Sequence, residues 1–506
     1  LVVCGSLPRV NSAWPGVTSM SEQVNQYGPY IGGERVAGDG TVTTRNPGTG
    51  EAVATVETAD AAVVDDAVAA AREAFPAWRD TDPDERGRIV YRIGQLVREH
   101  RDELAALEAS DQGKPESQAY SDMGGAARYF EYYAGAADKL EGKSVPVGTG
   151  GVDYTIREPY GVSAQVTPWN FPGNLFARGV APALVAGNTT VVKPAPNTPL
   201  SSLRLAELCA EAGVPDGVVN VVPGAGDTGE ALVAHEGVDQ VTFTGSVPTG
   251  QAIMRESAEH VRSVTLELGG KNPALVYPDA DIEDAASEIA TGIFTNAGQV
   301  CSAADRAVVH ESVVDEFLEA IVAEAEAYEL GPNADMGPLC SREHFERVAQ
   351  YIEIGKQEGA RLVTGGGTPE AQPDGDEQGG FYVEPTVFAD VEHESRIAQE
   401  EIFGPVLAVL TFSDTEEAVE IANGTEYGLT AGVFTENVSR AHTLARRLEA
   451  GNVYINGWFG DTNQTPFGGY GKSGIGREKG LEALNSYLQT KNVAVDLDGD
   501  GTLPGA

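Results

Sequence analysis

Residues 160–270 contain five short apolar runs: VSAQVTP (Val162–Pro168), TTVVKPA (Thr189–Ala195), GVVNVVP (Gly217–Pro223), QVTFTGS (Gln240–Ser246) and SVTLELGG (Ser263–Gly270). Each run is rich in β-branched residues and reaches Gly or Pro at its end, which is typical of a buried strand. Helical stretches such as SSLRLAELCAEAG and GEALVAHEG lie between several of them. Strands that alternate with helices in this way predict βαβ units around a parallel sheet, and therefore an α/β fold.

The sequence on either side adds a helical region, a hairpin and a second alternating region. Apolar residues recur at i, i+3, i+4 and i+7 from about 60 to 140, which predicts amphipathic helices. Segment 144–162 is rich in Gly and β-branched residues and predicts a hairpin. Strands and helices alternate again from 271 to about 470. The segment NSYLQTKNVAVDL (485–497) predicts a strand that returns to the hairpin.

The length and charge exclude several classes of function. The chain has 506 residues, with 76 Asp and Glu against 34 Lys and Arg, so its formal net charge is 34 − 76 = −42. This length predicts more than one domain, because single cores stop growing at roughly 250–300 residues. Without clustered Lys or Arg the chain is no general nucleic-acid binder, and an anionic membrane would repel it. No apolar run reaches the ~18–20 residues that span a bilayer.

The same charge indicates the surroundings of the protein. Acidic residues occur on predicted helix surfaces throughout, and there are only nine lysines. Such a chain repels itself at low ionic strength, and salt screens that repulsion. We therefore predict a high-salt cytoplasm, the alternative being an ordinary acidic protein. Four cysteines without CxxC spacing agree with a reducing compartment, and seven scattered histidines without HExxH predict no metal site.

The two ends of the chain differ from the rest. Residues 1–19 contain no acid, and the acid-rich sequence starts right after Met20. We interpret residues 1–19 as a disordered tail or as an extension upstream of a true start at Met20. Residues 497–506 predict a solvated acidic tail.

Two glycine-containing turns and one cysteine are candidates for chemistry. Gly224, Gly226 and Gly229 form a GxGxxG between a strand and a helix, and Gly245 and Ser246 follow another strand. Either turn can hold a phosphate at a helix N-terminus, and either can equally be an ordinary turn.

Cys301 lies in NAGQVCSAADR among small and polar residues, unlike a buried structural cysteine. Cys4 is in the extension, Cys209 is on an apolar helix face, and Cys340 is in a loop with no evident partner. Glu267 ends an apolar strand before two glycines, which suits either a structural acid or a general base.

Seven motifs in order identify a family resemblance. The chain resembles the aldehyde dehydrogenase superfamily from about Tyr27 to Val495, and the acid and the cysteine are 34 positions apart. The motifs are PWNFP (Pro168–Pro172), VVKP (Val191–Pro194), FTGS (Phe243–Ser246), ELGGKNP (Glu267–Pro273), GQVC (Gly298–Cys301), EEIFGP (Glu400–Pro405) and PFGGYGKSGIGRE (Pro466–Glu478).

The resemblance implies a division into domains and a homodimer or homotetramer. A Rossmann-like cofactor domain would comprise residues 20–140 and 160–268, and an α/β catalytic domain residues 269–470. A small β oligomerisation element would comprise residues 141–159 and 484–496.

The resemblance also implies a mechanism. Cys301 would attack the aldehyde carbon, and Asn170 with the Cys301 backbone N–H would hold the oxyanion. Glu267 would activate the water that hydrolyses the resulting thioester, so the product is a free acid. Two other classes of function are a structural relative without activity and a cysteine thioesterase. The first would have lost Cys301 or Glu267, and the second would not need the cofactor residues.

The resemblance further implies a nicotinamide cofactor. Lys193 matches the lysine at the adenosine ribose, and Glu401 and Phe403 match the residues at the nicotinamide ribose and ring. Further matches line the cofactor groove: Trp169, Gly226, Gly245, Ser246 and Leu268. Members that prefer NAD often have Glu three residues after the lysine, where this chain has Pro196. This departure favours NADP, with NAD as the alternative.

Arg178, eight residues after Asn170, bears on the substrate. Family members that act on succinate semialdehyde have a carboxylate-binding Arg at this spacing. A guanidinium fork matches a carboxylate, so we predict α-ketoglutarate semialdehyde (2,5-dioxopentanoate) or succinate semialdehyde as the substrate. The first would place the enzyme in oxidative pentose degradation. The alternative is that Arg178 pairs with a structural acid of the protein.

Overall fold

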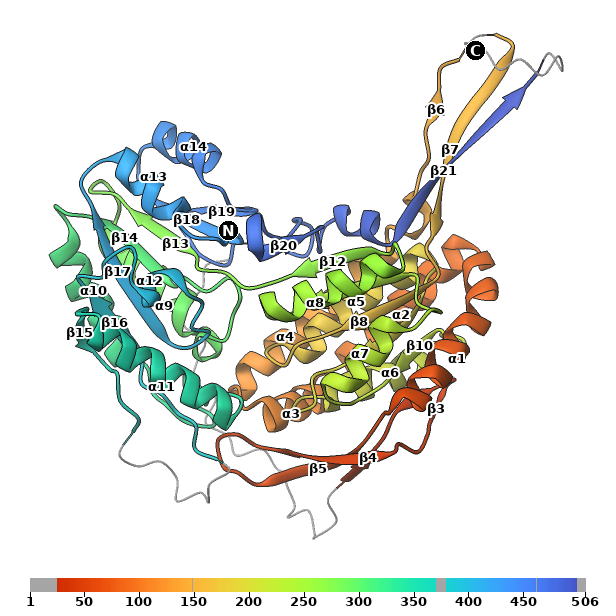
Figure 1. Ribbon diagram of the computed structural model, residues 1–506, viewed down its shortest axis with the longest axis horizontal. Coiled ribbons are helices and arrows are strands. Elements are labelled where there is room, and N and C mark those ends of the chain that lie inside the picture. The colour runs from red at the N-terminus through yellow and green to blue at the C-terminus, as the bar shows by residue number, and fades with distance from the viewer. Residues whose placement is uncertain (1–24, 148, 370–378, 461, 498–506) are drawn as a thin grey trace.

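The computed structural model describes residues 25–147, 149–369, 379–460 and 462–497. The predicted extension 1–19 lies outside these residues, as does the acidic tail apart from its first residue. Two large sheets form the body of the molecule, and a narrow sheet projects from it (Figure 1). No helix among the described residues is long and apolar enough to cross a membrane.

The first large sheet contains all five strands that the opening stretch predicted. It has eight strands in the order β20-β12-β11-β8-β9-β10-β2-β3. The five predicted strands run parallel to one another, as expected from the alternation with helices. The strand bounds are β2 Tyr30–Ile31, β3 Glu34–Arg35, β8 Val162–Val166, β9 Thr189–Lys193, β10 Val219–Val221, β11 Gln240–Thr244, β12 Ser263–Glu267 and β20 Gly474–Ile475.

Helices cover both faces of this sheet, so its central strands are buried on both sides. One apolar cluster packs α2 to α6 against one face, and another packs α1, α7 and α8 against the other. The helix bounds are α1 Ala61–Asp80, α2 Pro83–Glu99, α3 Arg101–Gln112, α4 Glu116–Ala134, α5 Pro172–Ala186, α6 Leu200–Glu211, α7 Gly226–Ala234 and α8 Val247–Glu259.

The second large sheet accounts for the second alternating region. It has seven strands in the order β15-β16-β17-β14-β13-β18-β19, parallel except for β15. Its strands are β13 Pro273–Val276, β14 Arg306–His310, β15 Arg361–Thr364, β16 Thr386–Ala389, β17 Val406–Phe412, β18 Thr430–Phe434 and β19 Asn452–Ile455. Its helices are α9 Ile282–Phe294, α10 Val314–Ala327, α11 Arg342–Gln357, α12 Arg396–Gln399, α13 Thr415–Asn423 and α14 Val438–Arg447.

The predicted hairpin and last strand form the projecting sheet. β7 (Gly151–Pro159) pairs with β6 (Ser144–Val145) on one side and with β21 (Leu488–Asp496) on the other. The long β7–β21 ladder extends away from both large sheets (Figure 1). A further sheet, which the sequence reasoning missed, is made of β1 (Asn25–Tyr27), β5 (Ala52–Thr58) and β4 (Gly40–Arg45).

The two large sheets meet end to end. In the first sheet β8, β9, β11 and β12 run in parallel register, so Val166 lies beside Lys193 and Thr244 beside Glu267. In the second sheet β14 and β17 begin side by side. The loops that follow the strands of the first sheet therefore meet the loops that precede the strands of the second sheet. The carboxyl ends of parallel strands are where α/β sheets bind ligands.

Candidate active site

A cavity of about 1050 Å³ lies where the two sheets meet. Most candidate residues from the sequence line it: Trp169, Asn170, Arg178, Gly245, Ser246, Glu267, Leu268, Cys301, Glu401 and Phe403. Lys193 and Gly226 are not part of its described lining, although Pro196 and Asn197 are. The cavity therefore brings together candidate residues up to 234 positions apart, from Trp169 to Phe403.

Cys301 lies in the loop that enters β14, and its position depends on a tight backbone. Asn296, Ala297 and Gly298 all have positive φ angles (50°, 54° and 72°). A Cβ at Gly298 would lie 2.1 Å from the Gly404 carbonyl oxygen, so only Gly allows this loop to pack against the EIFGP segment. Asn272 Nδ2 donates to the Cys301 carbonyl over 2.9 Å. Burial raises the pKa of the Cys301 thiol to about 12, and Arg178 partly opposes this rise.

Glu267 is the last residue of β12, and its carboxyl group is buried in the cavity wall. Neither carboxyl oxygen has a hydrogen-bond partner among the described residues. Burial, and then the neighbouring Glu478, raise the pKa of Glu267 well above its ordinary value. Burial therefore favours the neutral form of this carboxyl group, and a change in its surroundings can make it a base.

Asn170 lies two residues before α5 and is 5% exposed. Its side-chain Nδ2 donates to the Gln299 carbonyl over 2.9 Å, which ties PWNFP to the GQVC segment. An amide nitrogen carries two N–H groups, so one remains for an oxyanion in the cavity. The Asn170 carbonyl in turn accepts a hydrogen bond from Asn296 Nδ2 over 3.2 Å.

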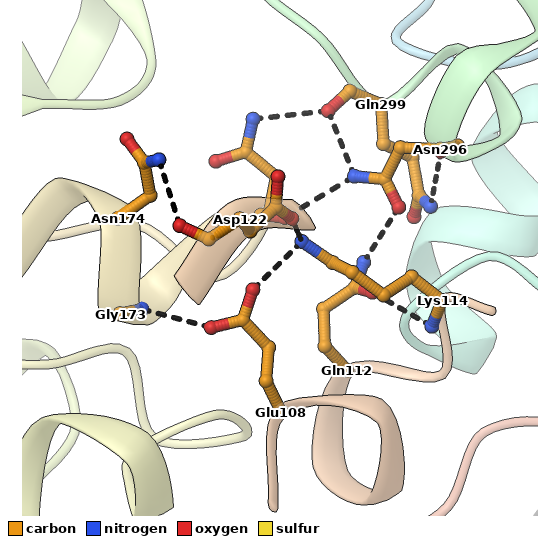
Figure 2. Close-up of polar contacts among 9 residues, drawn as sticks. Glu108, Gln112, Lys114, Asp122, Gly173, Asn174, Asn296 and Gln299 are labelled. Atoms are coloured by element: carbon orange, nitrogen blue, oxygen red, sulfur yellow. Dashed lines mark hydrogen bonds and ion pairs between the residues drawn. The ribbon is translucent and has the colours of Figure 1, made fainter. Parts of the chain in front are cut away.

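A buried charge cluster, which we name the Lys114 cluster, contacts the start of α5 next to Asn170 (Figure 2). It consists of Lys114, Glu108 and Asp122, and the Lys114 side chain is fully buried. Lys114 Nζ donates to Glu108 over 2.9 Å and to Asp122 over 2.6 Å. The other Glu108 oxygen accepts from the Gly173 N–H over 2.9 Å, at the start of α5. A carboxylate there satisfies a free N–H of the helix and opposes its positive end.

The same region has two further links to the catalytic loops. Lys114 Nζ lies 4.2 Å from the centre of the Phe171 ring, next to Asn170. Gln112 Nε2 donates to Asn296 over 3.2 Å, so the chain before Lys114 also holds the Cys301 loop (Figure 2). Sequence reasoning missed the Lys114 cluster, because nothing near Lys114 in the sequence indicates its partners.

Three rings and one carboxylate form another part of the cavity wall. The Trp169 ring lies 5.4 Å from Phe403 and 5.2 Å from His344, measured between centroids. His344 Nε2 donates to the Phe403 carbonyl over 2.7 Å, and burial lowers the His344 pKa to about 4, so the ring is neutral. Glu401 accepts from the Gly270 N–H over 2.9 Å. Burial raises the pKa of Glu401 to about 7.

The turn after β11 leads into α8 along the same cavity. The Gly245 N–H donates to the Glu267 carbonyl over 3.0 Å, which fixes the turn to β12. Ser246 is the N-cap of α8, and the first N–H groups of such a helix suit an anion.

Lys193 lies beyond this lining, against α7. A Cβ added at Gly229 would lie 3.9 Å from Lys193 Cδ. Burial lowers the Lys193 pKa to about 8, an effect that Asp227 opposes. Gly226 is the first residue of α7, with open space where a Cβ would lie.

Arg178 lines the cavity, yet its charge is already paired inside the protein. Its Nε lies 2.5 Å from Glu478 Oε2, and both side chains are buried. This is the pairing that the alternative interpretation of Arg178 predicted. Glu478 therefore matches the charge of Arg178 within the protein, and the binding of a substrate carboxylate by Arg178 stays a prediction. The acid escaped sequence reasoning because it lies 300 positions from Arg178.

Comparisons with known proteins agree with this geometry. The profile of the aldehyde dehydrogenase family matches residues 35–493. A hydroxyisobutyraldehyde dehydrogenase of Mycolicibacterium austroafricanum is 44% identical over 476 residues, covering 93% of this chain and 94% of the relative.

Two solved structures are also similar. An NAD⁺ complex of an aldehyde dehydrogenase from Bacillus cereus is 44% identical, with a TM-score of 0.90 over 94% of this chain and 97% of that one. An indole-3-acetaldehyde dehydrogenase with NAD⁺ is 40% identical, with a TM-score of 0.91 over 94% and 98%. On the profile, the identity and the shared fold, this chain belongs to the aldehyde dehydrogenase family.

Proposed function

We propose that the protein is an NAD(P)-dependent dehydrogenase that oxidises a carboxylate-bearing aldehyde to the acid through a thioester at Cys301. The family supplies aldehyde oxidation. The observation that carries the proposed mechanism is that Cys301, Glu267 and Asn170 line one cavity although they come from three separate segments. A nucleophile, a titratable carboxyl group and an oxyanion donor are the parts that acyl chemistry requires.

The residues present fit a nicotinamide dinucleotide. A Cβ at Gly269 would lie 2.4 Å from Glu401 Oε2, so the glycine makes room for the carboxylate that would bind ribose hydroxyls. Ser246 and the start of α8 would hold the phosphates, and Phe403 with Trp169 would hold the nicotinamide end. Lys193 and Gly226 would hold the adenosine end. When bound, the dinucleotide supplies the two-electron acceptor.

In the proposed mechanism, this chain's own residues act at two stages. First, Cys301 Sγ gives its proton to solvent water and bonds to the aldehyde carbon, while Asn170 Nδ2 and the Cys301 N–H stabilise the oxyanion. After the two-electron oxidation, the substrate is a thioester on Cys301. Glu267, as a carboxylate, then takes a proton from a water that attacks the thioester carbon. The acid leaves, and Cys301 is free again.

We propose NADP as the preferred cofactor. Pro196 lines the cavity at a position where a glutamate would repel the 2′-phosphate of NADP. The uncharged proline causes no such repulsion. Two similar proteins have been solved with NAD⁺ bound, which supports a dinucleotide site in this chain. The proposed preference for NADP over NAD rests on Pro196 of this chain.

The proposed substrate is α-ketoglutarate semialdehyde or succinate semialdehyde. What supports it is the charge of the cavity wall near Cys301, where Arg178 and Lys479 are both lining residues. Because Glu478 pairs with Arg178, Arg178 contributes to this charge without being the sole anchor.

Three further proposals concern the setting of the enzyme. Residues 20–140 and 160–268 would serve as the cofactor domain and residues 269–470 as the catalytic domain. The projecting strands would join two or four copies, since Val152, Tyr154 and Val495 are exposed on them. The net charge of −42 supports the proposal that the enzyme functions in a cytoplasm of high salt concentration.

The direct test is a panel of aldehydes with NAD⁺ and NADP⁺, at low and molar salt, followed at the nicotinamide absorbance. We expect oxidation of ω-carboxylated aldehydes to acids, with the higher rate in salt. Absence of reduced cofactor with every aldehyde would contradict the function. Equal rates for carboxylated and uncharged aldehydes would contradict only the substrate class.

A further inference from the structure

The backbone carbonyls of the turn that carries Cys301 are all hydrogen-bonded within the protein. The Val300 carbonyl accepts from the Ala303 N–H over 3.0 Å, which closes a β-turn around Cys301. The Ser302 carbonyl accepts from the indole N–H of Trp458 over 2.9 Å. The carbonyls of Cys301 and Ala303 both accept from one amide nitrogen, which belongs to a buried asparagine of the ELGGKNP motif.

That asparagine is Asn272, and both ends of its amide are fixed. Asn272 Nδ2 donates to the Cys301 carbonyl over 2.9 Å and to the Ala303 carbonyl over 2.8 Å. Its Oδ1 accepts from the Thr430 N–H over 3.0 Å, so the amide presents its nitrogen to the turn. The Asp305 carboxylate accepts from the Asn272 backbone N–H and from Nδ2, each over 3.2 Å. Asn272 is 1% exposed, so bulk water does not compete for these bonds.

Fixing these carbonyls also fixes the direction of the N–H groups of the turn. A peptide unit is planar and trans, so the Ser302 N–H points away from the Cys301 carbonyl that Asn272 holds. Among the described residues, neither the Cys301 N–H nor the Ser302 N–H donates to a backbone oxygen. Burial raises the pKa of Cys301, and Arg178 and a backbone hydrogen bond from Ser302 oppose that rise.

We infer that Asn272 is a positioning residue for the proposed reaction, because its amide holds the turn with the Cys301 and Ser302 N–H groups facing the reacting sulfur. The inference rests on the proposed function, which assigns the Cys301 N–H to the oxyanion. Asn272 is not among the described lining residues of the cavity, so it acts through the turn and not on the substrate. Loss of its amide would leave two buried carbonyls without this donor, and their peptide units would be free to turn toward other donors.

The first test measures the reactivity of Cys301 in the full-length enzyme, without cofactor or aldehyde. Iodoacetamide alkylates the thiolate, and mass spectrometry of the Cys301 peptide gives the rate at each pH. For Asn272→Ala we expect the rate–pH profile to move up by about one pH unit, which lowers the rate at pH 8 about tenfold. Asn272→Ser keeps one donor and should recover part of the loss. The charged groups that affect the Cys301 pKa, which are Arg178, Glu267 and Glu401, are present in every variant.

Steady-state turnover gives a second measurement. With succinate semialdehyde (4-oxobutanoate) as the substrate, we expect the kcat of Asn272→Ala to fall about 10- to 100-fold, because a donor to the oxyanion is misplaced. We expect KM to change less than about threefold, because the residues that line the cavity are unchanged.

Asn220 provides the matched control. It is fully buried, its Nδ2 donates to the carbonyls of Gly217 and Thr190 over 2.7 and 3.2 Å, and its Oδ1 accepts from the Gly32 N–H over 3.0 Å. None of these residues is among the described lining of the cavity. Asn220→Ala should therefore lower the temperature of unfolding about as much as Asn272→Ala does, and should change neither the alkylation profile nor kcat.

Three results would overturn the inference. The first is an alkylation profile of Asn272→Ala that coincides with the wild type. The second is faster alkylation, which is the effect of a loosened loop that exposes the thiol. The third is an equal loss of reactivity in Asn220→Ala, because the effect would then follow global stability. If Asn272→Ala does not fold, Asn272→Ser undergoes the same comparisons.

The alkylation experiment also separates the inference from the proposed function. A wild-type enzyme that oxidises no aldehyde would overturn the proposed function. The alkylation profiles need no turnover, so they would still decide whether Asn272 directs the turn at Cys301.

Discussion

Lys114 and Lys479 are both buried lysines near the same catalytic loops, and their surroundings differ. Lys114 contacts two carboxylates, at 2.9 and 2.6 Å, which together raise its pKa despite complete burial. Lys479 has Arg178 as a neighbour, and burial and that neighbour lower its pKa to about 7. The Lys114 cluster is satisfied within the protein and is suited to hold a loop in place. Lys479 instead lines the cavity in which the substrate would bind.

Cys301→Ala tests the ligand-facing region with the largest expected effect. We expect turnover to fall more than about 1,000-fold, because the nucleophile is lost, while the free energy of unfolding changes little. Steady-state assays and denaturant unfolding measure the two quantities. Cys209→Ala is the matched control in the buried face of α6, and it should keep its turnover. Turnover near the wild-type rate in Cys301→Ala would contradict the mechanism.

Lys114→Met breaks the Lys114 cluster. Two carboxylates would lose their buried partner, so we expect the free energy of unfolding to fall by about 3–5 kcal/mol. Turnover should fall as well, because Glu108 holds the start of α5 beside Asn170. Lys139→Met, which removes an exposed pair with Asp138, should cost less than about 1 kcal/mol. Equal effects of the two substitutions would remove the contrast between the clusters.

Pro196→Glu tests the adenosine end of the cavity. The new carboxylate would accept hydrogen bonds from free ribose hydroxyls and repel a 2′-phosphate, so the kcat/KM ratio of NADP⁺ to NAD⁺ should fall about tenfold or more. Pro196→Gln is the uncharged control. A wild-type enzyme with a strong NAD⁺ preference would contradict our interpretation and direct attention to Asp227, the acid near Lys193.

The pH dependence of cofactor binding should show two limbs. The Glu401 pKa of about 7 means that its carboxylate forms, and affinity rises, as pH increases through 7. The Lys193 pKa of about 8 means that its charge is lost, and affinity falls, as pH increases further. We expect changes of about two- to tenfold on each limb, measured by NADPH fluorescence titration. Glu401→Gln should remove the acidic limb and leave the basic one.

The elements that have a local sequence pattern could be predicted from the sequence. The five strands of the opening stretch, and the return of β21 to β7, follow from β-branched runs bounded by Gly and Pro. Ten of the twelve candidate residues line one cavity because their loops leave or enter strands at one edge.

Features that depend on distant partners were missed. β20 joins the first sheet opposite Glu267, and only two residues long it has no detectable pattern. Arg178 with Glu478, and Glu108 with Gly173, are pairs that only the folded chain brings together. The small β1-β5-β4 sheet was also not predicted, because β1 is only three residues long and pairs with a strand about 29 positions later.

The central claim is that Cys301 carries the acyl group and Glu267 removes it by hydrolysis. The most direct measurement is a rapid-mixing experiment on Glu267→Gln with 4-oxobutanoate and NADP⁺, followed by intact-mass analysis. We predict a burst of about one equivalent of NADPH per site, slow turnover afterwards, and an acyl adduct on Cys301 that Cys301→Ala lacks. Wild-type steady-state turnover in Glu267→Gln, or a burst with no adduct on Cys301, would contradict the claim.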